Sequence, residues 1–517
     1  SLTLISAMGE GYRVERLPSG WAVIGGETGL LYGAYALIRT RFSSDSASLP
    51  EAFYSSPRYS LRMLNCWDNV SGVVERGYSG RSLFFEGNNF SVDEKRLRQL
   101  GRMLASVGIN TFPYTTLFRS KTADRVYAAI PDLAGFLVKA DSEGRPGPFA
   151  YGRTHAEGAN LLARALAPHG GVLVWRCFVY NCRQDWRDAS IDRGRAAYDT
   201  YAPLDGKFDS NVILQIKHGP FDFQVREPLS PLLLAMPNTR KALELQLAQE
   251  YTGQQIDIYT MMPMWKELME DLPQENIMAM AAVSNLGRDW NYTGHPLAAA
   301  NLFGYGLFSW NPDLSPEEIT SQWIRLTWPS FNDSQRASLR DLLLSSRRVY
   351  EKYTSPLGLG WMITPNTHYG PNPSGYEYDL WGTYHRANRN AVGVDRTSRG
   401  TDYLSQYPDS LRLRYESPET CPDLYKLFFH RLPYDYVLQD GRTLIQRIYD
   451  DHFEGVEAVE SMAETLAALP FPEPEASVIR DRMALQLSNS REWRDVINTF
   501  FYRLSGIPDA HGRKIYE

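Results

Sequence analysis

The chain has 517 residues, of which 43% are hydrophobic and 22% charged, and its net charge of −6 is spread along its length. This length predicts two or three domains, and this composition is ordinary for a soluble globular protein. A basic run typical of nucleic-acid binding is absent, and so is an apolar stretch of the roughly 18 residues that a membrane span needs. Neither a nucleic acid nor a membrane is therefore expected as a partner.

Four cysteines are present, and none forms a CxxC pair or lies at zinc-finger spacing from a histidine. They are Cys66, Cys177, Cys182 and Cys421. Free thiols favour a reducing compartment, so we expect a cytoplasmic location. Because the chain opens on Ser1 without a signal peptide, as if partway through a domain, a periplasmic or secreted location stays open as an alternative.

The first 45 residues predict a partial α/β domain. Residues 11–25 alternate as a hairpin does, around a turn of Pro18, Ser19 and Gly20, and a helical pattern follows over 29–41. Residues 43–58 are rich in serine and contain two prolines, which is typical of a linker.

From residue 59 to residue 315, short apolar runs alternate with helical segments such as 93–106 and 155–168. The runs begin at Tyr59, Val107, Gly135, Gly171, Asn211, Leu243 and Met278. Each run ends in polar residues, which is typical of the strands of a parallel (β/α)8 or TIM barrel with its active site at the strand ends. Residues 46–315 therefore predict a catalytic barrel. Residues 316–517 predict a mainly helical domain, with apolar stripes over 333–352, 441–468 and 474–503 and long loops over 354–400.

The barrel pattern contains a fault near residues 111–120. Only seven strands are predicted, whereas a closed barrel of this class has eight, and the step from Val107 to Gly135 is the shortest between consecutive runs. Residues 112–120 inside that step read Phe-Pro-Tyr-Thr-Thr-Leu-Phe-Arg-Ser, which a widely used short-read sequencing adapter encodes when translated in frame. We interpret this segment as an assembly scar that replaces one barrel strand.

Three acids lie at predicted strand ends: Glu143, Asp222 and Glu250. Glycoside hydrolysis uses two carboxyl groups, one protonated to assist the leaving oxygen and one ionised to act on water or on the sugar. The alternative is that these acids only face solvent or cap helices.

Three cations lie at matching depths: Lys139, Arg176 and Lys217. Such a cluster suits an anionic substrate, although each cation could instead neutralise a neighbouring acid. Trp67 follows the first strand and is either a platform for a sugar or a core residue at the barrel rim. The sequence contains no GxSxG, HExxH, P-loop or strand-linked GxGxxG motif, so serine-nucleophile, metal and nucleotide chemistry are unsupported, and neither a metal nor a cofactor is expected.

Taken together, these stretches resemble glycoside hydrolase family 67. The resemblance covers nearly the whole chain, and KADSEG with GPFDFQVRE at their mutual spacing is its most specific part. Other matching stretches include RMLNCWDNVSGVVERGYSGRSLFF, VLVWRCFVYNCRQDWRD, LELQLAQEYTGQQ, HYGPN and FFHRLPYDY.

The resemblance implies an inverting, exo-acting enzyme that needs no metal and releases α-1,2-linked (4-O-methyl)glucuronic acid from xylooligosaccharides derived from glucuronoxylan. It also implies an N-terminal α/β domain, a central barrel and a C-terminal helical domain that mediates a homodimer. The matching positions imply that Glu143 is the general acid and that Asp222 and Glu250 are the pair that activates water. They further imply that the glucuronate pocket is lined by Lys139, Arg176, Lys217, Trp67 and Trp361.

The sequence also departs from the family pattern. Cys66 stands where the family usually has His, and the segment between Leu268 and Ala279 is shorter than usual. Roughly 60 or more residues, including the third strand, are missing where residues 111–120 now stand. Two alternatives therefore stay open, namely a retaining glycosidase of another barrel family and a glucuronate-binding fragment without activity. A carboxyl separation of about 5 Å favours retention, and one of about 6.5–9.5 Å favours inversion.

Overall fold

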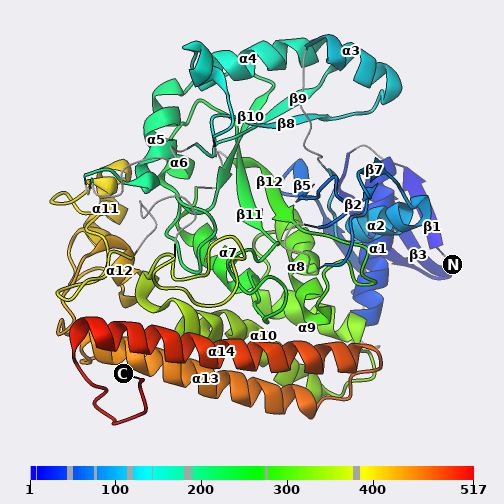
Figure 1. Cartoon of the computed structure of the whole chain (residues 1–517). Helices are drawn as coiled ribbons and strands as arrows, with labels where there is room; N and C mark the ends of the chain where they lie inside the picture. The colour runs from blue at the N-terminus through cyan, green and yellow to red at the C-terminus, as the bar shows by residue number, and fades with distance from the viewer. Residues whose placement is uncertain are drawn as a thin grey trace.

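A curled sheet of six parallel strands forms the centre of the molecule, and helices pack around it (Figure 1). The structure is a computed structural model that describes residues 2–6, 9–43, 50–74, 79–112, 120–142, 144–179, 188, 190–273, 277–375 and 385–516. In spatial order, the strands are β5 (Leu61–Cys66), β12 (Ile277–Ser284), β11 (Lys241–Gln246), β10 (Val212–Lys217), β9 (Val172–Arg176) and β8 (Gly135–Lys139). Every residue of β10 and β11 is buried, as expected for parallel strands that are covered on both faces.

The sheet follows the strand order of a (β/α)8 barrel but does not close within the residues that the structure describes. The last strand, β12, pairs with the first, β5, in the register Ala279↔Leu61 to Ser284↔Cys66. Among the described residues, no strand pairs with the second edge of β8, which contacts β9 on its other side. The architecture is therefore TIM-barrel-like with part of its wall missing.

The missing part lies where the sequence shows its fault. The run that begins at Val107 was predicted as the second of seven strands, but among the described residues it is reduced to a parallel bridge between Thr111 and Met63. Thr111 still donates its N–H to the oxygen of Arg62 at 3.3 Å and accepts from the N–H of Leu64 at 2.9 Å. The run thus begins to pair beside β5, as a second barrel strand would. Residues 113–119 of the predicted scar lie outside the described residues.

The helices around the barrel begin at the signals that the sequence carries. Asp93 caps α2 by accepting from the N–H of Arg96, and Thr154 forms a capping box with Glu157 at the start of α4. The predicted helices at 93–106 and 155–168 are confirmed. In chain order these helices are α2 (Glu94–Ser106), α3 (Ser120–Ala129), α4 (His155–Leu166), α5 (Ala196–Tyr201), α6 (Pro231–Leu234), α7 (Met262–Asp271) and α8 (Ala299–Trp310), and a short hairpin of β6 (Phe85–Glu86) and β7 (Asn89–Phe90) precedes α2.

A separate four-stranded sheet precedes the barrel, and α1 (Glu27–Ser43) packs on it. Its strands, in spatial order, are β1 (Leu2–Ser6), β3 (Gly20–Gly25), β2 (Tyr12–Leu17) and β4 (Ala52–Ser55). The predicted hairpin is confirmed as β2 and β3. The predicted linker at 43–58 contains β4, which pairs antiparallel with β2 and places the Phe53 ring against Tyr12. The N-terminal sheet therefore extends beyond the boundary predicted at residue 45.

Long helices underlie the barrel, and α13 and α14 run side by side along the base of the molecule (Figure 1). The three predicted apolar stripes are confirmed as α10, α13 and α14. The helices of this region are α9 (Pro316–Thr327), α10 (Asp333–Thr354), α11 (Asp409–Glu416), α12 (Lys426–Phe429), α13 (Leu444–Ala467) and α14 (Glu475–Ser505). Among the described residues, no helix has the combination of length and apolar character that a bilayer crossing requires.

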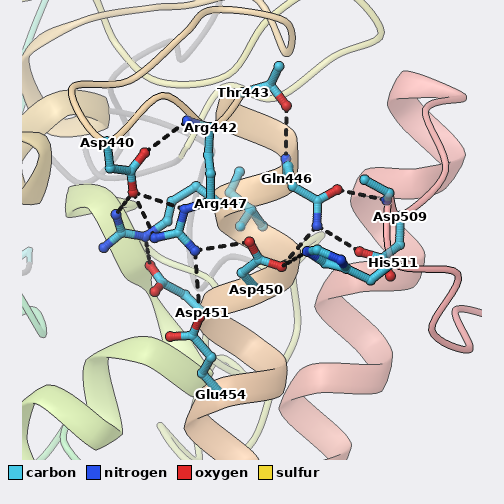
Figure 2. Close-up of polar contacts among 12 residues, drawn as sticks. Asp440, Arg442, Thr443, Gln446, Arg447, Asp450, Asp451, Glu454, Asp509 and His511 are labelled. Carbon is cyan, nitrogen blue, oxygen red and sulfur yellow. Dashed lines mark hydrogen bonds and ion pairs between the residues drawn. The ribbon is translucent and has the colours of Figure 1, made fainter.

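A network of ion pairs fastens the segment after α14 to the start of α13 (Figure 2). Asp450 of α13 accepts from Arg442 at 2.9 Å and from Gln446 at 2.9 Å, and it also pairs with Arg513. Gln446 donates at 2.7 Å to Asp509, which follows α14. These bonds hold the C-terminal segment on the helical region.

Candidate active site

The ends of three neighbouring strands bring the predicted cations around one aromatic ring, that of Phe178. Lys139, Arg176 and Lys217 are the last residues of β8, β9 and β10. Their charged groups lie 5.1, 5.7 and 3.3 Å from the centre of the Phe178 ring. A fourth cation, Arg193, lies 5.4 Å from it. An aromatic face attracts cations, so this ring gathers positive charge at one end of the barrel.

Arg176 is also held from inside the barrel by Glu244, a residue of β11 that the sequence analysis did not select. The guanidinium donates to the two carboxylate oxygens at 2.7 and 2.5 Å, and Glu244 is fully buried. Burial raises the pKa of Glu244, but the charge and hydrogen bonds of Arg176, together with Lys217 and Gln215, outweigh burial and leave that pKa below its ordinary value. Gln215 donates to the same carboxylate at 2.5 Å. Arg176 therefore neutralises a neighbouring acid, which is the alternative that the sequence analysis left open for each cation.

Trp67 completes this side of the site. It follows β5 and is half-buried, and its ring lies 5.4 Å from the guanidinium carbon of Arg176. The first strand and the cation cluster thus meet at the same end of the barrel.

Asp222 lies in the loop after β10 and forms an ion pair with Lys217. The hydroxyl of Tyr251 donates to its other oxygen at 3.2 Å, and Arg193 lies 4.0 Å away. Burial raises the pKa of Asp222, but the charges of Lys217 and Arg193 outweigh it and hold that pKa well below its ordinary value. Burial lowers the pKa of Lys217 to about 8, because Asp222 offsets only part of the desolvation. Both groups are therefore charged at neutral pH.

A buried acid shapes the loop that carries Asp222. Glu227 accepts backbone N–H groups from Phe221 at 2.7 Å, Asp222 at 3.0 Å and Gln224 at 2.6 Å. Gly219 allows this arrangement, because a Cβ at that position would lie 2.2 Å from a carboxylate oxygen of Glu227. The stretch GPFDFQVRE is thus a self-contained loop in which the final Glu fixes the backbone around the Asp.

Glu250 lies beyond β11 in a buried segment and pairs with His368 at 2.9 Å. The ring of Tyr251 lies 4.5 Å from the ring of His368 and 5.3 Å from that of Trp361. Because Tyr251 also donates to Asp222, this single side chain joins the surroundings of both acids and of Trp361. His368 opens the stretch HYGPN in the predicted functional loops, and this was the one sequence signal that pointed to it.

The predicted general acid, Glu143, lies outside the described residues. Two positions earlier, Asp141 accepts from the N–H of Phe149 at 3.0 Å and lies 3.5 Å from the imidazole of His155. His155 is held in turn by the indole N–H of Trp175 at 3.2 Å. The strand end that leads to Glu143 is therefore anchored by described contacts.

Within the part of the chain that the structure describes, no group of three His, Cys, Asp or Glu side chains is placed to hold a metal ion. Cys66, Cys177 and Cys421 are buried free thiols, and Cys182 falls outside the described residues.

Comparison with known proteins identifies similar sequences along nearly the whole chain. The model of the glycosyl hydrolase family 67 C-terminus matches residues 293–514, and that of the family 67 middle domain matches residues 43–119 and 113–281. Alpha-glucuronidase A of Aspergillus tubingensis is 36% identical over 564 residues, covering 94% of this chain and 67% of the relative. Probable alpha-glucuronidase A of Aspergillus clavatus is 37% identical over 568 residues, with the same coverage of each chain.

These alignments agree with an internal gap. The middle-domain model matches in two pieces that meet at residues 113–119, where the predicted scar lies. The alignment with the A. tubingensis protein is 564 positions long, although it draws on only 94% of a chain of 517 residues. Several dozen positions of that relative therefore have no residue opposite them in this chain.

Proposed function

Because the chain belongs to glycoside hydrolase family 67, we propose that it is an α-glucuronidase that removes α-1,2-linked (4-O-methyl)glucuronic acid from xylooligosaccharides with inversion. The observation that carries the proposal is the juxtaposition of two carboxylates, Asp222 and Glu250, around Tyr251. Lys217 links this pair to the cation cluster, since it contacts both Asp222 and the Phe178 ring. A site that combines acids for hydrolysis with clustered cations suits a glycoside that carries its own carboxylate.

In this proposal the cations recognise the uronic acid. Lys139, Arg176 and Lys217 come from three adjacent strands and lie around one ring, so a carboxylate placed among them meets positive charge from three sides. Arg176 and Lys217 are buried. A neutral glucoside would bring no carboxylate to these charges and would still displace water from them, which is unfavourable. Trp67 and Trp361 would contact the faces of the sugar.

The proposed chemistry divides between Glu143 and the other two acids. Glu143 protonates the departing glycosidic oxygen, and Asp222 with Glu250 activates the attacking water. Asp222 is suited to hold a water rather than to donate a proton, because its pKa lies well below the ordinary value. Tyr251 and His368 orient the two carboxylates through hydrogen bonds of 3.2 and 2.9 Å.

The decisive experiment measures release of glucuronic acid from an aldouronic acid and follows the anomer formed by NMR. It is run on the 517-residue chain and on a version in which a relative supplies the missing barrel segment. Glucuronic acid released as the β-anomer supports inversion, whereas α-anomer indicates a retaining enzyme. Equal turnover of α-glucosyl and α-glucuronosyl versions of one substrate would refute the recognition of the carboxylate.

The role of Glu143 has its own signature. Glu143→Ala in the repaired chain should impair substrates with poor leaving groups by about 10²- to 10⁴-fold and activated substrates much less, because the latter need little protonation. Equal loss on both substrate classes would count against this role.

A second candidate function, binding without turnover, is favoured by the open edge of β8. If the 517-residue chain binds glucuronate but only the version with the restored segment releases it, the function of the 517-residue chain is binding without turnover. We also propose a cytoplasmic location and a homodimer formed through the C-terminal helices, and sedimentation of the purified chain tests the latter.

A further inference from the structure

We propose that Asp257 is a positioning residue through which the C-terminal helices hold His368 against Glu250. The inference rests on the proposed function, because it assigns a support to one of the two water-activating acids. Asp257 is not one of the proposed catalytic acids: its carboxylate accepts hydrogen bonds from Tyr353, Tyr369 and Asn489.

Asp257 is a buried carboxylate shared among three parts of the chain. It is 1% exposed. One oxygen accepts from the hydroxyl of Tyr353 in α10 at 2.9 Å and from the amide of Asn489 in α14 at 2.7 Å. The other accepts from the hydroxyl of Tyr369 at 2.8 Å. A buried carboxylate needs such donors, so the three elements are bound together at this point.

The short loop that carries Asp257 contacts three consecutive residues, 367–369, of a segment that is distant in the sequence. Glu250 pairs with His368, Gln254 donates to the backbone oxygen of Thr367, and Asp257 accepts from Tyr369. We call these three contacts the 250–257 clamp. Within it, His368 pairs with Glu250 while its neighbours on either side, Thr367 and Tyr369, are bonded to the same loop. The clamp positions His368 relative to Glu250 from both directions.

Backbone geometry makes this clamp necessary. His368 has a φ of 54°, in the left-handed region that a residue with a side chain rarely adopts. Such a conformation persists only where the surroundings hold it. The bond from Tyr369 to Asp257, on the residue directly after His368, supplies one of those constraints.

The loop is compact enough to form the clamp because of Gly253. Its φ is +91°, and a Cβ there would lie 2.6 Å from the Cβ of Asp257. The stretch EYTGQQ therefore combines a catalytic candidate with the turn that returns the chain to Asp257. Burial raises the pKa of Asp257 to about 6, against the hydrogen bonds of Tyr369, Tyr353 and Asn489, so the carboxylate is ionised and accepts all three at neutral pH.

The test removes the hydrogen bond between Tyr369 and Asp257 by changing either residue. Tyr369→Phe deletes only the hydroxyl, and Asp257→Asn keeps the shape of the carboxylate. The matched control is Tyr449→Phe, which deletes the hydroxyl of another buried tyrosine of the helical region, one that donates to the Ile507 oxygen at 2.8 Å. Hydrogen–deuterium exchange of residues 362–372 is measured for each variant of the 517-residue chain, and kcat and KM on an aldouronic acid are measured for the same variants of the repaired chain.

We expect exchange of residues 362–372 to rise about tenfold in both variants and to stay unchanged in the control. We also expect kcat to fall about 10- to 100-fold while KM changes less than about twofold, because Asp257 positions a catalytic group and touches no sugar. The double variant should lose no more than Asp257→Asn alone, since Tyr369→Phe breaks a bond that Asp257→Asn already disrupts.

Unchanged exchange in Tyr369→Phe and Asp257→Asn would overturn the proposal, and so would fully additive losses in kcat. The exchange measurement does not depend on turnover. If even the repaired chain releases no glucuronate but exchange rises as expected, the proposed function fails and the positioning role of Asp257 stands.

Discussion

Glu244 and Arg176 form a two-pronged ion pair inside the barrel, with N–O distances of 2.7 and 2.5 Å and with the carboxylate fully buried. The pair links β11 to β9 across β10, which lies between them in the sheet. It fixes the orientation of a guanidinium that we propose lines the uronate pocket.

Removing one partner of this pair should be far more damaging than removing a surface pair. Glu244→Ala leaves Arg176 as a buried charge without its acid, so we expect the free energy of unfolding to fall by roughly 3–5 kcal/mol in urea titration. Glu94→Ala, which breaks the exposed 3.6 Å pair with Arg98, should cost less than about 1 kcal/mol. Equal losses in the two variants would contradict a structural role for Glu244.

Asp222 and Glu250 should both be needed for turnover and not for folding. Asp222→Asn and Glu250→Gln in the repaired chain should each lower kcat by about 10²- to 10⁴-fold while glucuronate still binds. Glu270→Gln, at an exposed acid on α7, is the control and should leave kcat unchanged. If either variant at the site kept near-normal turnover, that residue would be a bystander.

Binding of glucuronate should weaken above about pH 8. The pKa of Lys217 is lowered from 10.5 to about 8, so its charge is present below that pH and is lost as the pH rises through it. If that charge recognises the carboxylate, calorimetry should show affinity falling about tenfold per pH unit above 8. The free energy of unfolding changes in the opposite sense. The cost of burying the charged Lys217 is present below about pH 8 and is relieved between pH 8 and 10.5, so the protein becomes more stable over that range.

A matched control separates the site from a general effect of pH. Lys241 is also buried with a pKa of about 8, but it begins β11 and donates to the Leu233 oxygen at 2.9 Å. Lys241→Gln should therefore leave the pH dependence of binding intact. Loss of that dependence in Lys241→Gln, or its survival in Lys217→Gln, would contradict the assignment to Lys217.

Restoring the missing barrel segment from a relative should raise activity. Among the described residues, the second edge of β8 has no strand partner. A barrel wall without one of its strands leaves strand positions less constrained, and displacement of a catalytic group by about 1 Å costs around 10²-fold in rate. We expect the repaired chain to unfold more cooperatively and to turn over at least about 10²-fold faster. Comparable cooperativity and turnover in the unrepaired chain would show that the neighbouring strands compensate.

The sequence predicted the elements whose signals are local. The hairpin at β2 and β3 was predicted from alternation around a turn, and α10, α13 and α14 from apolar stripes. Lys139, Arg176 and Lys217 were selected because each ends an apolar run, and parallel strands of similar length place their ends together. The shortest step between runs located the missing wall, since strand spacing is itself a local pattern.

Only the tertiary structure showed what these residues contact. Glu244 sits in the middle of a buried strand, where its neighbours in sequence give no hint of Arg176, 68 residues away. His368 and Glu250 are 118 residues apart, and Asp257 and Asn489 are 232 apart. Periodicity determines which side chains face inward and where strands end. Which acid meets which cation depends on how the barrel, its loops and the C-terminal helices pack, because burial makes those pairings strong and no local pattern encodes them.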